Sequence, residues 1–440
     1  MARPAPDCSL EPAARTLRLW LWLCAAVVGA LAAGATVGLR WLTQVVEWLA
    51  TGGSGGLVEV ARSLAPWHRA MVVAGGGLVA GLLLDAGHAW ARRGPGGDRH
   101  LDYIDAARQG RVDLNDRTTF TRTASAVVSV GTGASIGREG PMVQMAAWLA
   151  ARLAQLLPFT PPERSILLIC GAAAGIGSTY HAPVAGVVFV LELALGFFAR
   201  RTVAPVLIAV STASGLIHWL LDPAPLYVMP VAHLHSASLG VALLAGVFFG
   251  LAGWGLLALL KHCRLLFARV PTYALRLGLG GLLVGLLSAA MPEVWGNGYS
   301  VVSRVLQEGI AWQTLAMILL LKVLATALSS GSGAVGGAFT PSLFVGAAAG
   351  CVLAQLAMLW LPAALVGDPR AMAVIGMAAM LAAMTHAPVM AIVMVLEMTN
   401  QFHLAIPVML ASGMAYAVST GFGAHPLYGN PIEVDESGKT

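Results

Sequence analysis

Two glycine-rich segments of the chain have the composition of a binding site for a small anion. Residues 131–141 read Gly-Thr-Gly-Ala-Ser-Ile-Gly-Arg-Glu-Gly-Pro, and residues 331–341 read Gly-Ser-Gly-Ala-Val-Gly-Gly-Ala-Phe-Thr-Pro. Glycine lets the backbone approach a ligand closely, and a helix N-terminus presents unpaired N–H groups with a partial positive charge. Such amides hold an anion more loosely than a fixed Lys or Arg would, which suits rapid release. The two segments therefore predict an anion site built for transport.

Glu139 places a carboxylate inside the first of these segments, which is flanked by apolar sequence. Ionisable groups at membrane depth are costly and generally functional. Because a carboxylate can occupy the amide-lined position that an anion prefers, Glu139 is predicted to obstruct the anion path when ionised. The alternative is a structural role, in which Glu139 is a buried partner of the neighbouring Arg138.

A second pair of similar segments indicates that the chain is internally duplicated. Residues 171–192 match residues 376–397, and 11 of the 22 aligned positions are identical. In duplicated transporters the substrate site lies at the interface of the repeats, on discontinuous helices near the membrane midplane. The glycine-rich pair thus marks the predicted site. His181 and His386 occupy equivalent positions in the second pair and are predicted to be packed at helix ends, not to bind metal.

The composition is typical of a membrane protein. Hydrophobic residues make up 58% of the chain and charged residues 11%, against about 25% charged in a soluble domain. A helix needs about 20 apolar residues to cross a bilayer. Four uncharged runs meet this length: residues 19–39, 165–191, 202–221 and 236–260. Residues 323–367 and 371–396 also lack charge, and each must hold more than one short helix.

Arginine predicts the orientation of the chain, because cytoplasmic loops are enriched in it. Arg3, Arg15 and Arg18 precede the first span, and seven Arg lie within residues 92–122. Both segments are predicted to be cytoplasmic, with two crossings between them. The first apolar run is too long for a cleavable signal peptide. The basic residues are scattered and not clustered with aromatics, so nucleic acid is not an expected partner.

Residues 137–141 and 337–341 resemble the two signature loops, GREGP and GxFxP, of the ClC family of chloride channels and chloride/proton exchangers. Other segments agree with the family across nearly the whole membrane region: 171–175, 181–183, 387–388, 396–399 and 426–428. Three further segments look most similar to the bacterial ClcB-type branch: 97–104, 295–300 and 331–334.

The resemblance implies an all-α, polytopic fold of inverted repeats with many short and broken helices. It also implies a homodimer, with one pore per subunit, in contact with lipid in a bacterial inner membrane. We expect a cytoplasmic segment at 1–18, a membrane domain at 19–430 and a cytoplasmic tail at 431–440. The repeats are placed at about 70–221 and 270–430. The tail is too short for the paired regulatory domains of larger relatives, and no cofactor is expected.

The resemblance also assigns roles to individual residues. Glu139 would be the gating, proton-linked glutamate. The amides of Ala338 and Phe339 and the hydroxyl of Tyr428, an uncharged donor, would bind the central chloride. The remaining predicted anion-binding residues come from the same two loops: Gly137, Arg138, Gly140, Gly337 and Thr340. The alternative for Tyr428 is an aromatic residue of the membrane interface.

The sequence departs from the family pattern at two places. The family's GSGIP loop, whose serine faces the central anion, has no clear counterpart at residues 96–100. Leu193 stands where many exchangers carry an inner proton-accepting glutamate. Because an apolar side chain cannot relay a proton, we predict a voltage- or pH-gated chloride channel. The alternative is a chloride/proton or fluoride/proton exchanger, with water or Glu192 in place of the missing acceptor.

An enzymatic alternative is based on residues 52–55, Gly-Gly-Ser-Gly, which fit the G-x-S-G motif of rhomboid-type intramembrane serine proteases. The motif is only four residues long and has no partner histidine at a recognisable helical spacing. Proteolysis is therefore a remote alternative, and the protein is predicted not to be an enzyme.

Overall fold

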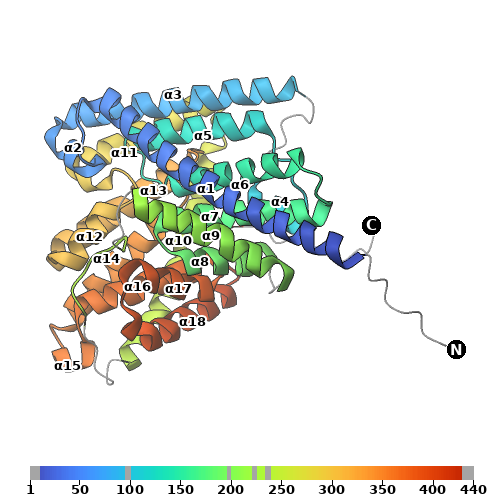
Figure 1. The fold of residues 1–440 in the computed structure, drawn as a ribbon. Coiled ribbons are helices and arrows are strands. Elements are labelled where there is room, and N and C mark those ends of the chain that lie inside the picture. The colour runs from blue at the N-terminus through green and yellow to red at the C-terminus, as the bar shows by residue number, and fades with distance from the viewer. Residues whose placement is uncertain (1–9, 95–100, 196–199, 221–224, 233–238, 429–440) are drawn as a thin grey trace, which may run out of the picture.

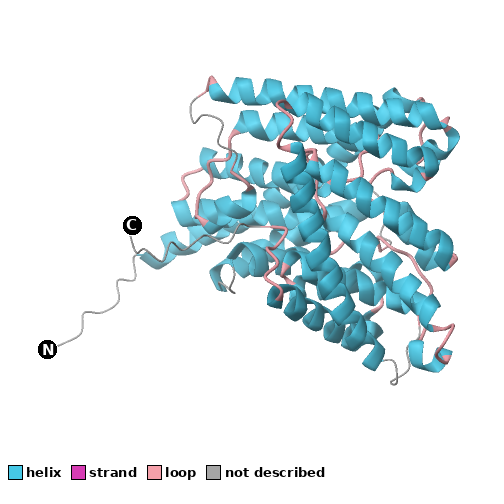
Figure 2. Cartoon of the chain, turned by 180° about the vertical axis from the view of Figure 1, so that it is seen from behind, coloured by secondary structure: helices cyan, strands magenta, loops and turns pink. Residues whose placement is uncertain are grey.

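All regular secondary structure in the described part of the chain is helical (Figure 2). The computed structural model describes residues 10–94, 101–195, 200–220, 225–232 and 239–428. The α-helices are α1 (Leu10–Thr51), α2 (Leu57–Ser63), α3 (Pro66–Arg92), α4 (Tyr103–Arg108), α5 (Asp116–Gly131), α6 (Glu139–Leu156), α7 (Pro161–Tyr180), α8 (Pro183–Phe189), α9 (Arg200–Leu220), α10 (Leu239–Phe267), α11 (Tyr273–Ala290), α12 (Tyr299–Gln307), α13 (Trp312–Gly331), α14 (Phe339–Ala357), α15 (Ala363–Val366), α16 (Pro369–Thr385), α17 (Pro388–Thr399) and α18 (Ala405–Gly421). Shorter helical turns are η1 (Val190–Leu195), η3 (Pro292–Val294) and η4 (Phe402–Leu404).

The apolar runs of the sequence correspond to membrane-length helices, with one correction. Within the described residues, nine helices are long and apolar enough to cross a membrane. The runs predicted at 19–39, 202–221 and 236–260 lie in α1, α9 and α10, and the two long uncharged stretches each contain parts of several helices, as expected. The prediction of one span at 165–191 is wrong, because this run is divided between α7, α8 and η1.

The break between α7 and α8 has a local cause that recurs in the second repeat. His181 ends α7 and His386 ends α16, both in the left-handed conformation with φ of 55°. A left-handed residue is a common way to end a helix. Each histidine is followed by Ala-Pro, and the proline begins the next helix, where its missing N–H has no partner to lose. The His-Ala-Pro sequence is therefore a helix break, and the helix-end placement of both histidines is confirmed.

Helices at matching positions of the two repeats have matching neighbours. α6 packs on α7 as α14 packs on α16, and α7 packs on α9 as α16 packs on α18. α3 packs on α5 as α11 packs on α13, and the same holds for α1 with α9 and α10 with α18. Figure 1 shows α3 along one edge of the molecule and α16, α17 and α18 along the opposite edge. The predicted all-α fold of inverted repeats is confirmed.

The two repeats meet closely along α3 and α11. Gly77 and Gly81 of α3 lie against the backbone of α11, and Gly281 and Gly285 of α11 lie against the backbone of α3. A side chain at any of these positions would overlap main-chain atoms of the facing helix. Small residues allow such close contact between membrane helices, where dispersion forces and not water exclusion hold them together.

Two glutamates join the repeats at a second place, between α8 and α17. Glu192 in η1 accepts hydrogen bonds from the backbone N–H groups of residues 389–390, at 3.2 and 2.7 Å. Glu397 in α17 accepts them from residues 184–185, at 3.0 and 2.7 Å. A carboxylate at a helix N-terminus satisfies unpaired amides and interacts favourably with the helix dipole. Each repeat therefore caps one helix of the other.

Candidate functional site

The two glycine-rich segments lie side by side where the repeats meet. The N–H of Gly137 donates to the carbonyl of Gly337 at 2.8 Å, and the N–H of Gly337 donates to the carbonyl of Gly137 at 2.9 Å. Immediately after this bridge α6 begins at Glu139 and α14 begins at Phe339. Two helix N-termini, from segments 200 residues apart in the sequence, therefore converge on one point.

The first amides of both helices lack side-chain caps. Arg138 and Ala338 occupy equivalent cap positions, and neither side chain accepts a hydrogen bond from the helix that follows it. Their backbone angles are also similar, with φ and ψ of −82° and −5° at Arg138 and −92° and 8° at Ala338. Uncapped N–H groups carry the partial positive charge of the helix dipole. This point of convergence is thus suited to an anion or a carboxylate.

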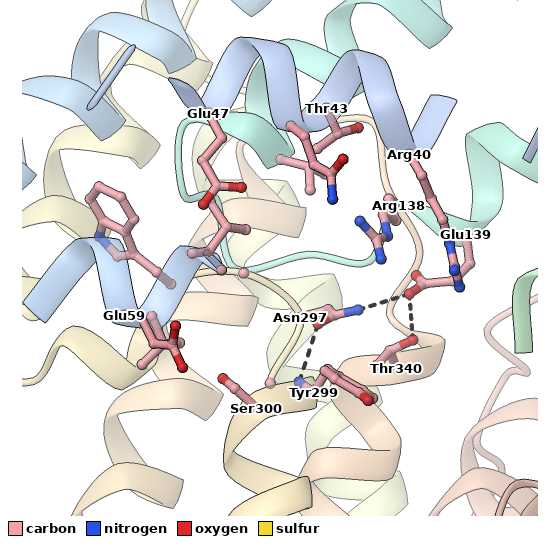
Figure 3. A pocket seen from close by; sticks show the side chains of 18 of the residues that line it. Arg40, Thr43, Glu47, Glu59, Arg138, Glu139, Asn297, Tyr299, Ser300 and Thr340 are labelled. Atoms are coloured by element: carbon pink, nitrogen blue, oxygen red, sulfur yellow. Dashed lines mark hydrogen bonds between the residues drawn. The ribbon is translucent and has the colours of Figure 1, made fainter. Parts of the chain in front are cut away.

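Glu139 is the carboxylate at this point, and its side chain is 5% exposed. Its Oε1 accepts hydrogen bonds from the Thr340 hydroxyl at 2.7 Å and from the Asn297 amide at 2.9 Å (Figure 3). Its Oε2 has no hydrogen-bond partner and lies over Gly137, where a Cβ would overlap it. Glycine at 137 therefore leaves the space that the carboxylate fills. The structural alternative required Arg138 as the partner of Glu139. The hydrogen-bond partners are instead two neutral donors, Thr340 and Asn297.

A cavity of about 780 Å³ lies on one side of Glu139 and is shown in Figure 3. Its charged lining residues are Arg40, Glu47, Glu59, Arg138 and Glu139. The guanidinium of Arg40 donates to the carbonyl of Thr179 at 3.3 Å, and its charge acts on both Arg138 and Glu139. The charged lining is of mixed sign, with two guanidinium groups and three carboxyl groups. Arg138, one of the predicted anion-binding residues, lines this cavity.

Tyr428 lies close to Gly337, one of the two residues of the Gly137–Gly337 bridge. Its hydroxyl is 3.4 Å from the position that a Cβ would take at Gly337. Its ring contacts Phe339 and Phe189, with a ring-centre distance of 6.5 Å to each. Gly140 also faces Gly337. Tyr428, Gly140, Gly337 and Phe339 are not among the described residues that line the cavity, whereas Glu139 is.

Thr340 and Asn297 both donate hydrogen bonds to Glu139, a role that was not predicted from the sequence. Thr340 was expected to bind the anion, but its hydroxyl donates to Glu139 in this structure. Asn297 was not predicted as a site residue, although the segment 295–300 that contains it was recognised as characteristic. It is 158 residues from Glu139 in the sequence, so only an alignment that showed a preference for Asn there could have identified it.

A further carboxylate close enough to influence Tyr428 is that of Asp102, the residue that caps α4. The Asp102 carboxylate accepts a hydrogen bond from the N–H of Ile104, and its charge acts on the Tyr428 hydroxyl. Burial raises the pKa of the Asp102 carboxyl, and the hydrogen bond from Ile104 and the charge of Arg122 oppose that rise. The departure from the family pattern at residues 96–100 lies outside the described residues.

Leu193, which stands in place of the family's inner glutamate, and Glu192, which was considered as its substitute, both make structural contacts. Leu193 is 5% exposed, and its carbonyl accepts hydrogen bonds from Nη2 and Nε of Arg108 at 2.9 and 3.2 Å. Glu192 uses both carboxylate oxygens to cap α17. Both oxygens of the Glu192 carboxylate are therefore engaged at the start of α17.

The serine of the protease-like motif, Ser54, lies at the edge of the cavity. Among the described residues that line this cavity there is neither a histidine nor a lysine to act as its base.

The fold and the site together define a class of protein: a duplicated helical membrane transporter in which broken helices of both repeats converge on a buried carboxylate. Residues 76–420 match the family described as voltage gated chloride channel. The chain is 43% identical over 420 residues to a ClcB-like chloride channel protein of Ralstonia nicotianae, covering 93% of this chain and 95% of that protein. It is 37% identical to the voltage-gated ClC-type chloride channel ClcB of Escherichia coli O81, covering 92% and 97%.

Two solved structures have the same fold. A slow cyanobacterial Cl⁻/H⁺ antiporter matches with a TM-score of 0.81 at 22% identity, covering 93% of this chain and 96% of that one. A CLC-type fluoride/proton antiporter matches with a TM-score of 0.73 at 23% identity, covering 96% and 99%. The chain belongs to the ClC family of chloride channels and transporters, in its ClcB-type branch. The resemblance inferred from the signature loops is thereby confirmed.

Proposed function

We propose that the protein conducts chloride, or a similar small anion, through a path that Glu139 gates, as a channel of a bacterial inner membrane. The observation that carries this proposal is the position of the Glu139 carboxylate. It lines the cavity and lies over Gly137, at the convergence of two uncapped helix N-termini. That convergence is where amides suited to an anion are available.

The proposed path begins in the cavity, which we place on the extracytoplasmic side. Its lining includes residues 54–59, just after the end of α1 at Thr51. The opposite end of α1 contains Arg15 and Arg18, which are predicted to be cytoplasmic. Arg40 and Arg138 would attract an anion into the cavity. The anion would then pass Glu139 and meet the amides of Ala338 and Phe339 and the hydroxyl of Tyr428.

The proposed gate depends on the charge of Glu139. When ionised, the carboxylate accepts the hydrogen bonds of Thr340 and Asn297 and occupies the anion position. Protonation, or competition from an anion at high concentration, frees that position because a neutral carboxyl is a weaker acceptor than a carboxylate. The residues proposed to form the central site, Gly137, Gly140, Gly337, Ala338, Phe339 and Tyr428, supply only neutral groups, which favours release.

We favour a channel over an exchanger because of Leu193 and Glu192. The first cannot carry a proton, and the second already caps α17. The names of the two structural relatives, a Cl⁻/H⁺ antiporter and a fluoride/proton antiporter, support the alternative of coupled exchange. We further infer that the protein forms a homodimer in contact with lipid, has no resident cofactor or metal and is not an enzyme.

The deciding experiment is to impose a proton gradient across sealed liposomes that contain the purified protein and equal chloride on both sides. A channel follows the anion gradient alone, so no net chloride movement is expected. Uphill chloride movement driven by protons would overturn the channel assignment. The same liposomes with fluoride in place of chloride measure selectivity, and protein-free liposomes are the control for leakage.

A further inference from the structure

The geometry points to Asn297 as a latch that holds the Glu139 carboxylate in the anion path, and to Lys322 as the residue that positions Asn297. This inference rests on the proposed role of Glu139 as the gate. Neither residue belongs to the signature loops: Asn297 lies between η3 and α12 and contacts Glu139, and Lys322 lies in α13.

Lys322 is a fully buried cation within the membrane-length helix α13. Its Nζ donates to three successive carbonyls, those of residues 294–296, at 2.7, 3.0 and 2.5 Å. These three acceptors match the three donors of an ammonium group. A charge at this depth is costly and generally functional. Here it fixes the backbone immediately before Asn297.

The segment around Asn297 also packs between the first glycine-rich segment and α14. The Trp295 ring is fully buried and lies against Gly133. Gly298 lies against Phe344 of α14. Gly296 and Gly298 have φ of 66° and 93°, values that favour glycine over other residues. The two glycines turn the chain on both sides of Asn297, so that its side chain projects toward Glu139 (Figure 3).

The orientation of the Asn297 amide follows from its two hydrogen bonds. Its Oδ1 accepts from the backbone N–H of Tyr299 at 3.2 Å, which leaves Nδ2 to donate to Glu139 at 2.9 Å. Because a backbone N–H can only donate, this contact fixes which end of the amide faces the carboxylate. Asn297 therefore stabilises the ionised form of Glu139 in its present position.

Asn297 acts among several other groups that face or influence Glu139 from the helices around it. These are Arg40 of α1, Arg138 before α6, Tyr180 of α7, Tyr227, Thr340 of α14 and Tyr428. A latch made of an amide does not titrate, so its strength changes only with the charge and position of Glu139. Loss of the Asn297 donor destabilises the carboxylate relative to the protonated form, and the gate should then open at higher pH.

The test is chloride efflux from liposomes between pH 4.5 and 8 for four variants and the wild type. In Asn297→Ala we expect the pH of half-maximal flux to rise by about one unit, a tenfold change, which is the scale of one hydrogen bond to a charged group. Ser300→Ala, altered three residues away, should keep the wild-type midpoint. In the Glu139→Gln background, Asn297→Ala should change nothing further.

The positioning role of Lys322 is tested by measuring whether the effect of changing Lys322 depends on the presence of Asn297. Lys322→Met and Lys322→Gln are made in parallel, since the loss of a buried cation can impair folding, and whichever is folded decides the point. The midpoint should shift in the same direction as in Asn297→Ala, and the double variant should shift no further than Asn297→Ala alone. Additive shifts, or no shift, would overturn the positioning role.

Failure of the latch can be told from failure of the gate. If Glu139→Gln keeps the wild-type pH profile, the proposed function fails and the latch with it. If Glu139→Gln flattens the profile but Asn297→Ala leaves the midpoint unchanged, the latch alone is overturned.

Discussion

The two glycine-rich segments have similar backbones and different side chains. In the proposed function, the backbone forms the anion path and the side chains form its gate. Each segment pairs through its glycine, Gly137 with Gly337, and each then starts a helix without a side-chain cap. After that point the first segment places Arg-Glu and the second places Ala-Phe. The backbone that the two segments have in common supplies the amides of the proposed anion path. The side chains differ, because the first repeat supplies the charge of Glu139 and the second supplies the hydroxyl of Thr340 that donates to it.

A second unequal pair follows the same rule. Arg122 and Lys322 occupy equivalent positions in the two repeats, 200 residues apart. Lys322 binds the carbonyls of residues 294–296 just before Asn297, whereas the charge of Arg122 acts on Asp102. By contrast, Glu192 and Glu397 each cap a helix of the other repeat. We infer that side chains with the same role in both repeats maintain the fold and that side chains with different roles form the gate.

The largest expected effect is at Glu139, where the side chains of the two segments differ most. Glu139→Gln removes the charge that the second repeat lacks, so the flux should lose its pH dependence and rise about tenfold or more at neutral pH. The reason is that each hydrogen bond to the carboxylate contributes on the order of 1.5–3 kcal/mol. Chloride efflux from liposomes measures it, and Glu139→Asp, which keeps a carboxylate, should keep a pH-dependent profile. Wild-type pH and voltage dependence in Glu139→Gln would remove the gate.

A smaller effect is expected at Tyr428, which acts on the shared passage and not on the charge. Tyr428→Ala should weaken chloride binding about fivefold, the scale of one neutral hydrogen bond. Isothermal calorimetry on the detergent-solubilised protein measures the affinity. Tyr428→Phe keeps the ring contacts with Phe339 and should show the same loss if the hydroxyl is the ligand. Unchanged affinity in both variants would take Tyr428 out of the site.

The smallest expected effect is at Glu192 and Glu397, which have the same role in the two repeats. The effect should be of the same size at both positions. Glu192→Gln and Glu397→Gln should each lower the free energy of unfolding by about 1 kcal/mol, since each weakens one charged helix cap. Thermal unfolding in detergent measures the change, and anion flux and its pH dependence should stay at wild-type values. A change of proton coupling in Glu192→Gln alone would break the symmetry and revive the exchanger alternative.

The amino-acid sequence determined what depends on spacing and composition along the chain. The offsets of 200 and 205 residues revealed the duplication, the uncharged runs indicated the membrane helices, and the signature loops identified the family and the position of Glu139. These features are local, because helix length, helix breaks and backbone access depend on neighbouring residues. Even the one wrong span, 165–191, contained its own correction: Pro183, two residues after His181, is a signal for the end of one helix and the start of another.

The tertiary structure decided which side chains meet. Asn297 and Thr340 are 158 and 201 residues from Glu139, and Glu192 reaches the start of α17 across the boundary between the repeats. Hydrophobic pattern and helix propensity specify where a helix lies in the chain but not which polar atom faces it from the other repeat. Arg138 beside the cavity, Thr340 on the gate and Lys322 behind Asn297 follow from the inversion of one repeat against the other. That inversion brings two helix N-termini together, and a buried carboxylate there must take its donors from whatever the opposite repeat presents.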